Sequence, residues 1–176
     1  MRVAVYCGSS DEVPVSYLEA AEEMGRLLAA RGHVVVFGGG RVGLMGALAR
    51  GARAGGGKIE GVILDKFLEM GVGDPEVKEM AVVGDMSSRK RGLRERAQAH
   101  LVLPGGVGTL DELFEVLSLK YIGLAGDPVV VLDHGGFYAP LLALLERMVG
   151  EGFLKSPLGD LLSVAASPEE VVRILE

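Results

Sequence analysis

Short runs of apolar residues alternate with longer amphipathic stretches along the whole chain. The run at 33–37 (HVVVF) is rich in β-branched residues and has the pattern of a strand buried on both faces. Strands that alternate with helices form βαβ units, in which the strands are parallel and the helices cover both faces of the sheet. The pattern predicts an α/β fold: a Rossmann-like, doubly wound domain with a mostly parallel sheet. Ligands of such sheets bind beyond the carboxyl ends of the strands, where the strand order reverses.

The expected elements divide the chain without a gap large enough for a linker. Strands are expected at 2–7, 33–37, 59–64, 77–83, 100–103, 128–132 and 161–164. Helices are expected from 14 or 16 to 31, and over 42–54, 86–98, 110–122 and 137–149, with a short last helix from 168. Residues 65–76 are the least regular part. With no internal repeat or composition break, residues 1–176 are expected to form one domain.

Composition limits the possible partners. Glycine accounts for 27 of 176 residues, about twice the usual share of roughly 7%, which fits a domain whose loops approach a ligand closely. The net charge of −6 argues against nucleic acid or a membrane surface as a partner, so any anion site must be local. Cys7 is the only cysteine, and the chain has neither a signal-peptide pattern nor a membrane-length apolar run. We therefore expect a cytoplasmic location.

Two glycine-rich segments follow expected strands. Gly38–Gly43 matches G-x-G-x-x-G, but it follows the second strand, and only Glu60 or Asp65 could be the acidic residue expected about 20 positions later. A tight turn and a direct ligand contact both remain open for it, and a dinucleotide-dependent oxidoreductase would rest on this match alone. Pro104–Thr109 is more informative, because its three glycines and the next helix can aim backbone N–H groups at one phosphate. It is no P-loop, since no lysine follows.

Charged residues near the second segment suggest chemistry. Glu112 is three residues after Thr109, so the two could form a capping box at the start of a helix. Alternatively, the Glu112 carboxylate could activate water near a phosphate held by Pro104–Thr109. Both interpretations stay open. Five of the 18 basic residues fall within eight positions, and Arg89 and Lys90 lie in the first turn of a helix that Asp85 can cap. Basic residues there oppose the helix dipole, which favours a functional role.

Other polar residues carry weaker signals. The three histidines, His33, His100 and His134, have no metal-ligand spacing, so no metal site is expected. Cys7 at a strand end is expected to pack and not to act as a nucleophile. Ser9 and Ser10 follow the first strand and could either contact a ligand or simply end the strand.

These motifs together resemble the LONELY GUY (LOG) family of cytokinin riboside 5′-monophosphate phosphoribohydrolases, often labelled lysine decarboxylase-like. The family motif P-G-G-x-G-T-x-x-E is complete at 104–112, G-G-G-x-x-G-L-M-G is complete at 38–46, and C-G-S-S stands at 7–10. The likeness extends from the first strand to Gly-Phe-Tyr at 136–138. The family's M-H-E-R-K reads Met86-Ser87-Ser88-Arg89-Lys90 here, and its I-P after the third strand reads Leu64-Asp65.

The resemblance implies hydrolysis of the N-glycosidic bond of a nucleoside 5′-monophosphate, such as AMP or a cytokinin riboside monophosphate, without a cofactor. It places Arg89 and Glu112 as the catalytic pair. It implies nucleotide binding by Gly8, Ser9, Gly39, Gly40, Gly43, Met86, Lys90, Gly105, Gly106, Val107, Gly108 and Thr109. It also implies a homodimer or a higher homo-oligomer. Lysine decarboxylation is not expected, because nothing identifies a cofactor-bearing lysine.

The alternative function is a binding protein that holds a nucleotide or a phosphorylated cofactor without cleaving it. The superfamily that the motifs resemble includes molybdenum-cofactor carrier proteins, and the two serines at 87 and 88 mark a departure from the enzymes.

Overall fold

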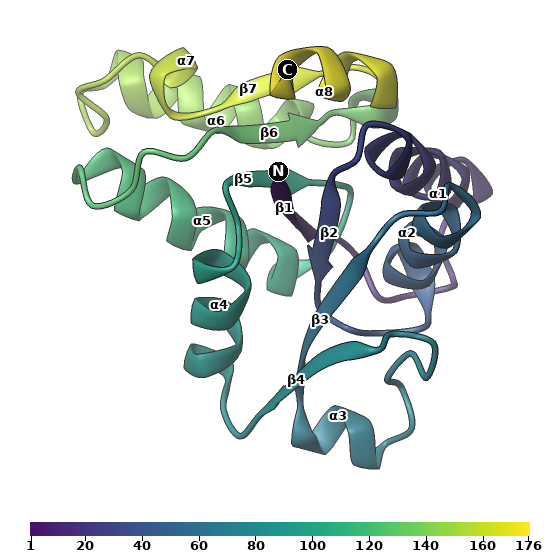
Figure 1. Cartoon of the computed structure of the whole chain (residues 1–176). Helices are drawn as coiled ribbons and strands as arrows, with labels where there is room; N and C mark the ends of the chain where they lie inside the picture. The colour runs from purple at the N-terminus through teal and green to yellow at the C-terminus, as the bar shows by residue number, and fades with distance from the viewer.

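A computed structural model describes residues 1–176 and contains one seven-stranded sheet (Figure 1). The strands lie in the order β4-β3-β2-β1-β5-β6-β7, and every neighbouring pair is parallel. They are β1 (Arg2–Tyr6), β2 (Val34–Phe37), β3 (Ile59–Leu64), β4 (Glu79–Val83), β5 (Ala99–Val102), β6 (Val129–Leu132) and β7 (Ser163–Ala165). The predicted α/β class and doubly wound arrangement are confirmed, and the sheet is parallel throughout.

Helices cover both faces of this sheet. Helices α1 (Val15–Ala30), α2 (Gly43–Ala54) and α8 (Pro168–Leu175) lie on one face (Figure 1), and their buried side chains share one core with that face. The other face is covered by α4 (Met86–Glu95), α5 (Val107–Tyr121), α6 (Ala139–Gly150) and α7 (Leu158–Leu161). The short α3 (Asp65–Glu69) buries none of its residues and follows β3 at the end of the sheet near β4. None of the helices has the length and apolar composition needed to cross a bilayer.

Successive side chains of the central strands point to opposite faces of the sheet and so contribute to two hydrophobic cores, one on each face. In β1, Val3 and Val5 face the α1–α2 side, whereas Ala4 and Tyr6 face the α4–α5 side. Each strand of the central region is buried on both faces, which explains why its sequence reads as a continuous apolar run.

The strand order reverses between β1 and β5, which fixes where two loops meet. The chain runs outward from β1 through β2 and β3 to β4, then returns to place β5 on the other side of β1. The loops after β1 and β5 are therefore neighbours, and Gly8 N donates a hydrogen bond to Pro104 O at 3.0 Å. This switch point is where the fold predicts a ligand.

Several element ends differ from the sequence expectation. Helix α5 begins at Val107 instead of residue 110, because glycine tolerates the extended N-cap conformation at Gly106 and leaves no side-chain signal of the start. Helix α4 ends at Glu95, three residues early, and the irregular 65–76 segment contains α3. The predicted Asp85 cap is confirmed, because its side chain accepts a hydrogen bond from Ser88 N. Ser167 caps α8 in the same way, by accepting from Glu170 N.

Candidate active site

A cavity of about 500 Å³ opens at the switch point. Its lining comes from the loops after β1, β2 and β5, from the ends of β1 and β3, from α3 and the loop after it, and from the first turns of α2 and α4 and the first two turns of α5. Ten residues that were predicted to act or bind line it: Gly8, Ser9, Gly40, Met86, Arg89, Gly106, Val107, Gly108, Thr109 and Glu112. The fold thus brings together most of the residues that the sequence singled out.

The first turn of α5 offers free hydrogen-bond donors to this cavity. Gly106 caps the helix with an extended backbone and has no side chain to accept from it. The backbone N–H groups of Val107, Gly108 and Thr109 donate to no protein acceptor, whereas that of Leu110 is already bonded to Gly106 O. All three residues with free N–H groups line the cavity. Together with the positive end of a 15-residue helix, they form a site suited to a phosphate dianion.

Helix α2 also begins at a glycine-rich loop, but its N-terminus is closed by the protein. Gly43 N donates to the Asp11 carboxylate at 2.7 Å, and Leu44 N and Met45 N both donate to Gly8 O. Gly43 has φ +60°, and a Cβ there would lie 2.5 Å from the Ser9 carbonyl carbon. The Gly38–Gly43 segment therefore supports the loop after β1 at this end, and its contribution to the cavity comes from Gly38, Gly40 and Val42.

Four residues predicted to bind nucleotide do not line the cavity: Gly39, Gly43, Lys90 and Gly105. Gly39 packs against Met80 and Ile63, and Gly43 packs against the Gly8 loop. A Cβ on Gly105 would lie 2.1 Å from Thr109 Oγ1, so glycine is needed there to seat the Thr109 side chain. Lys90 forms ion pairs with Asp111 and Glu115 on the neighbouring helix. The packing of these residues supports the loops and helices around the cavity.

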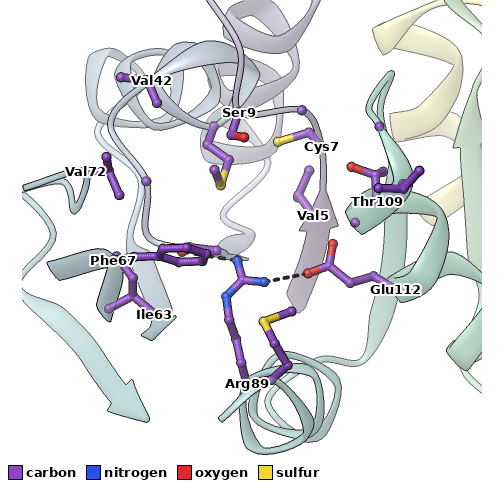
Figure 2. A pocket seen from close by; sticks show the side chains of 18 of the residues that line it. Val5, Cys7, Ser9, Val42, Ile63, Phe67, Val72, Arg89, Thr109 and Glu112 are labelled. Carbon is purple, nitrogen blue, oxygen red and sulfur yellow. Dashed lines mark hydrogen bonds and ion pairs between the residues drawn. The ribbon is translucent and has the colours of Figure 1, made fainter. Parts of the chain in front are cut away.

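A buried ion pair stands in the cavity wall. Arg89 Nη1 donates to Glu112 Oε1 at 3.0 Å and Arg89 Nη2 donates to Gly38 O at 3.4 Å, while Arg89 Nε has no partner. Both residues are only 8% exposed. Figure 2 shows the two side chains pointing toward each other, with Thr109 on the Glu112 side of the cavity. Through these hydrogen bonds Arg89 links helix α4 to the loop after β2, at Gly38, and to helix α5, at Glu112.

The environment of Glu112 alters its acidity. Burial raises the pKa of Glu112 to about 7, even though the Arg89 guanidinium acts in the opposite direction. A carboxyl group with a pKa in this range can exchange a proton near neutral pH. Such a perturbed group inside a cavity is typical of catalytic sites.

The capping-box interpretation of Thr109 and Glu112 is wrong. The N-cap of α5 is Gly106, so Thr109 is the third helical residue and Glu112 the sixth. Neither side chain makes a capping hydrogen bond. The alternative, a carboxylate facing the cavity near the phosphate loop, agrees with the geometry.

The serines that depart from the family pattern lie outside the cavity. Ser88 uses its N–H and its hydroxyl to bond the Asp85 carboxylate, and Ser87 is exposed. Met86, the first residue of α4, does line the cavity. The departure therefore changes the cap of α4 and leaves the Arg89–Glu112 pair intact.

Sequence reasoning missed an apolar wall on the side away from Thr109. Ile63, Phe67 and Val72 lie there (Figure 2), and Met70 also lines the cavity. The wall is attached to the loop after β2, because Arg41 N donates a hydrogen bond to Val72 O and Gly40 forms an isolated antiparallel β-bridge with Gly73. Three of these residues fall in the irregular 65–76 segment. Its apolar residues, in a stretch without clear periodicity, were the available signal.

No group of three or more His, Cys, Asp or Glu side chains is placed to hold a metal ion. His33, His100 and His134 lie apart from the cavity lining, as does Ser10. Cys7 lines the cavity but is buried, and burial raises the pKa of its thiol, so it suits packing better than nucleophilic attack.

The fold and the cavity define the chain as a Rossmann-like α/β protein with a candidate ligand site at the switch point. A family model described as "Possible lysine decarboxylase" matches residues 45–175. A probable cytokinin riboside 5′-monophosphate phosphoribohydrolase of Oryza sativa subsp. japonica is 38% identical over 175 residues, which cover 99% of this chain and 72% of the relative. A cytokinin riboside 5′-monophosphate phosphoribohydrolase of Arabidopsis thaliana is 37% identical, with 99% and 82% covered. The chain belongs to the LONELY GUY (LOG) family.

Solved structures extend the comparison of the fold. The molybdenum cofactor binding protein of Rippkaea orientalis superposes with a TM-score of 0.76 at 22% identity, covering 99% of this chain and 94% of that one. The Moco carrier protein of Chlamydomonas reinhardtii gives a TM-score of 0.74 at 22% identity, with the same coverage. At these identities the similarity concerns the fold alone.

Proposed function

We propose that this protein hydrolyses the N-glycosidic bond of a nucleoside 5′-monophosphate, releasing the free base and ribose 5-phosphate. One observation carries the proposal. A single cavity contains both the free N–H groups at the start of α5 and the buried Arg89–Glu112 pair. The first feature suits a phosphate, and the second suits acid–base chemistry near neutral pH.

The arrangement of the cavity suggests how the substrate lies. The 5′-phosphate accepts hydrogen bonds from Val107, Gly108 and Thr109 N–H. The ribose then lies over the Glu112 carboxylate, and the base extends toward the apolar wall of Ile63, Phe67, Met70 and Val72. Arg89 Nε is a buried donor without a protein partner, which a bound nucleotide can satisfy.

The proposed chemistry needs Glu112 in its ionised form. As the bond between C1′ and the base nitrogen breaks, positive charge develops on the ribose, and a carboxylate near C1′ stabilises it. Glu112 can also accept a proton from the attacking water. The hydroxide part of the water ends on C1′, and the remaining proton ends on the departing base. Arg89 orients the carboxylate through its 3.0 Å hydrogen bond. This reaction requires no cofactor.

The family description "Possible lysine decarboxylase" finds no support in the cavity. No lysine lines it, although a pyridoxal-type cofactor would need one for its Schiff base. The names of the curated relatives agree with a phosphoribohydrolase instead.

A panel of nucleoside monophosphates, including AMP and an N6-alkylated AMP, tests the proposal. Each is incubated with the protein and the free base is measured by chromatography, with the Glu112→Gln variant as the matched control. We expect base release by the wild type and at least about a hundredfold less by the variant, the usual effect of removing an acid–base group. Binding of a monophosphate without release of base would favour the carrier function instead.

We also propose that the protein is a cytoplasmic homodimer. The support for a dimer is a set of exposed apolar side chains on α5, α6 and the loops that follow them: Val107, Phe114, Ile122, Leu124, Leu144 and Phe153. An interface between two subunits would bury such apolar surface. The cytoplasmic location rests on the single, unpaired cysteine.

A further inference from the structure

Helices α4 and α5 are joined by a row of ion pairs that extends beyond Arg89 and Glu112. Lys90 Nζ lies 2.9 Å from Asp111 Oδ1 and 2.9 Å from Glu115 Oε2. One turn further along α4, Arg94 Nε lies 3.7 Å from Glu115 Oε1. Arg89 and Lys90 are consecutive on α4, and their partners Glu112 and Asp111 are consecutive on α5. The pair in the cavity is therefore one member of a longer interhelical network.

Helix α4 has few other anchors. Of its ten residues only Arg89 and Leu93 are buried. A helix with a single buried apolar side chain gains little from the hydrophobic effect, so its position depends on the polar contacts that it makes. The Lys90 side chain is 20% exposed and that of Glu115 is 28% exposed, so this ion pair is partly shielded from solvent, whereas the Asp111 side chain is 53% exposed.

The network also lies directly behind Glu112. Tyr6, Lys90, Arg94, Glu112 and Glu115 line one narrow cleft with no space for a water molecule. Charges that water does not separate act strongly on each other. The network can therefore affect both where Glu112 lies and how readily it ionises.

The charged groups around Glu112 act in opposite directions. Burial is the largest influence and raises the pKa of Glu112, Arg89 lowers it, Asp111 raises it and Lys90 lowers it. On the β1 side, Tyr6 lines the narrow cleft and Cys7 lines the cavity together with Glu112, and burial raises the pKa of both groups, so neither is ionised. Lys90 and Asp111 thus form a pair whose effects on Glu112 partly cancel.

We propose that Lys90 is a positioning residue: its ion pairs with Asp111 and Glu115 hold α4 against α5, so that Arg89 meets Glu112, and they balance the charge beside the Glu112 carboxylate. Lys90 does this from outside the cavity, without touching the substrate. The inference rests on the proposed function for its consequence in catalysis. The geometry behind it does not depend on any substrate.

Two single variants should have opposite effects. Lys90→Met removes the cation and leaves Asp111 and Glu115 unpaired, so Glu112 should ionise at higher pH. Asp111→Asn removes an anion but leaves the ion pair between Lys90 and Glu115 to hold α4 against α5, so Glu112 should ionise at lower pH. In the pH profile of kcat/KM for AMP, the acid limb should move to higher pH in Lys90→Met and to lower pH in Asp111→Asn. We expect about half a pH unit or more, which is roughly a threefold change in rate on the limb.

Arg91→Met is the matched control, because Arg91 is exposed on the same helix and forms none of these ion pairs. It removes the same charge and should leave the limb in place. The double variant Lys90→Met with Asp111→Asn should return the limb toward its wild-type position.

The ionisation of Glu112 can be followed without turnover, by NMR of ¹³C-labelled glutamate carboxyl groups, with the Glu112 signal assigned through Glu112→Gln. A Glu112 titration midpoint that is higher than in the wild type for Lys90→Met and lower for Asp111→Asn supports the positioning role. This holds even if AMP is not hydrolysed, in which case the proposed function alone fails. Midpoints that move together, or not at all, overturn the positioning role whether or not AMP is hydrolysed. If Lys90→Met does not fold, Asp111→Asn decides: a lower midpoint supports the role and any other result overturns it.

Discussion

Glu112 is held in a state that costs stability at neutral pH. Burial raises the pKa of Glu112 from an ordinary value of 4.5 to about 7, so the folded protein keeps a proton that the unfolded chain releases. Between these two values the folded state binds more protons, and stability must fall as the pH rises. A group kept in such a state is more consistent with function than with folding.

Comparison with Glu112→Gln isolates this contribution, because glutamine cannot ionise. We expect the free energy of unfolding of the wild type, minus that of the variant, to decrease as the pH rises from about 5 to about 7, and to level off above that range. Urea unfolding at a series of pH values measures the difference. A difference that is constant or increases over this range would show that the pKa of Glu112 is not raised by folding.

Arg89 makes a second prediction at this scale. Its guanidinium bonds Glu112 Oε1 and Gly38 O with two different nitrogens, a fork that the single ammonium of lysine cannot reproduce. Arg89→Lys should therefore lose about a hundredfold or more in kcat/KM for the monophosphate substrate. Arg91→Lys, on the exposed face of the same helix, should stay near the wild-type rate. Similar losses in the two variants would remove Arg89 from the site.

The sequence led to these two residues through motifs, but it could not decide what Glu112 does. Thr109 and Glu112 have the spacing of a capping box, and only the true start of the helix excludes that role. The N-cap is Gly106, a residue whose lack of a side chain hides it from any search for polar caps. The ion pairs of Lys90 were equally hidden, because they join residues on two separate helices.

At the scale of elements, the start of α5 is the feature on which binding depends. Its two glycines before the first turn have different tasks. A Cβ on Gly106 would meet nothing within 4 Å, whereas a Cβ on Gly105 would collide with Thr109 Oγ1 and approach Gly8 N to 2.9 Å. Gly106 lines the cavity and Gly105 does not.

Substitutions at the two positions should therefore separate binding from folding. Gly106→Val should keep the stability of the wild type within about 1 kcal/mol, but weaken nucleotide binding by filling the approach to the free N–H groups. Gly105→Ala should lower the free energy of unfolding by about 1–3 kcal/mol through overpacking. Urea unfolding and calorimetric titration with AMP measure the two effects. Equal stability losses would contradict this division.

The order of elements could be predicted from alternation alone, but their ends could not. Residues 33–37 and 59–64 read as strands because each is bounded by glycine or polar residues, and β3 has the bounds that were expected. Helix α3 and the apolar wall were not visible, since five residues are too few to establish a helical period. Their position depends on contacts with the glycine-rich loop that local sequence does not encode.

For the whole molecule, the parallel sheet accounts for the location of the site. The reversal of strand order brings residues 8–9 and 106–109 together although they are about a hundred positions apart in the chain. The fold class predicted such a meeting point, and the resemblance to the LOG family named Gly8, Ser9 and Gly106–Thr109 as binding residues, but the strand order that brings them together was not predicted. Strand order is set by packing of helices on the two faces, which no single segment records.

The proposed dimer is tested at this scale. Leu144 on α6 and Phe114 on α5 belong to the exposed apolar set, so Leu144→Asp or Phe114→Asp should produce monomers from a wild-type dimer. Val15→Asp is the control, since Val15 is exposed on α1, on the opposite face of the sheet. Size-exclusion chromatography with light scattering gives the mass of each variant. A wild type that is already monomeric would refute the proposal.

The central claim is that this cavity recognises a 5′-phosphate, and a comparison of AMP with adenosine at equal concentration and pH tests it most directly. Each charge-assisted hydrogen bond contributes about 1.5–3 kcal/mol. Loss of two such bonds with the phosphate corresponds to a decrease of roughly 10²–10⁴ in kcat/KM. We predict that adenine is released from AMP, and that kcat/KM for release from adenosine is lower by at least about a hundredfold. Comparable rates on the two compounds would contradict the account.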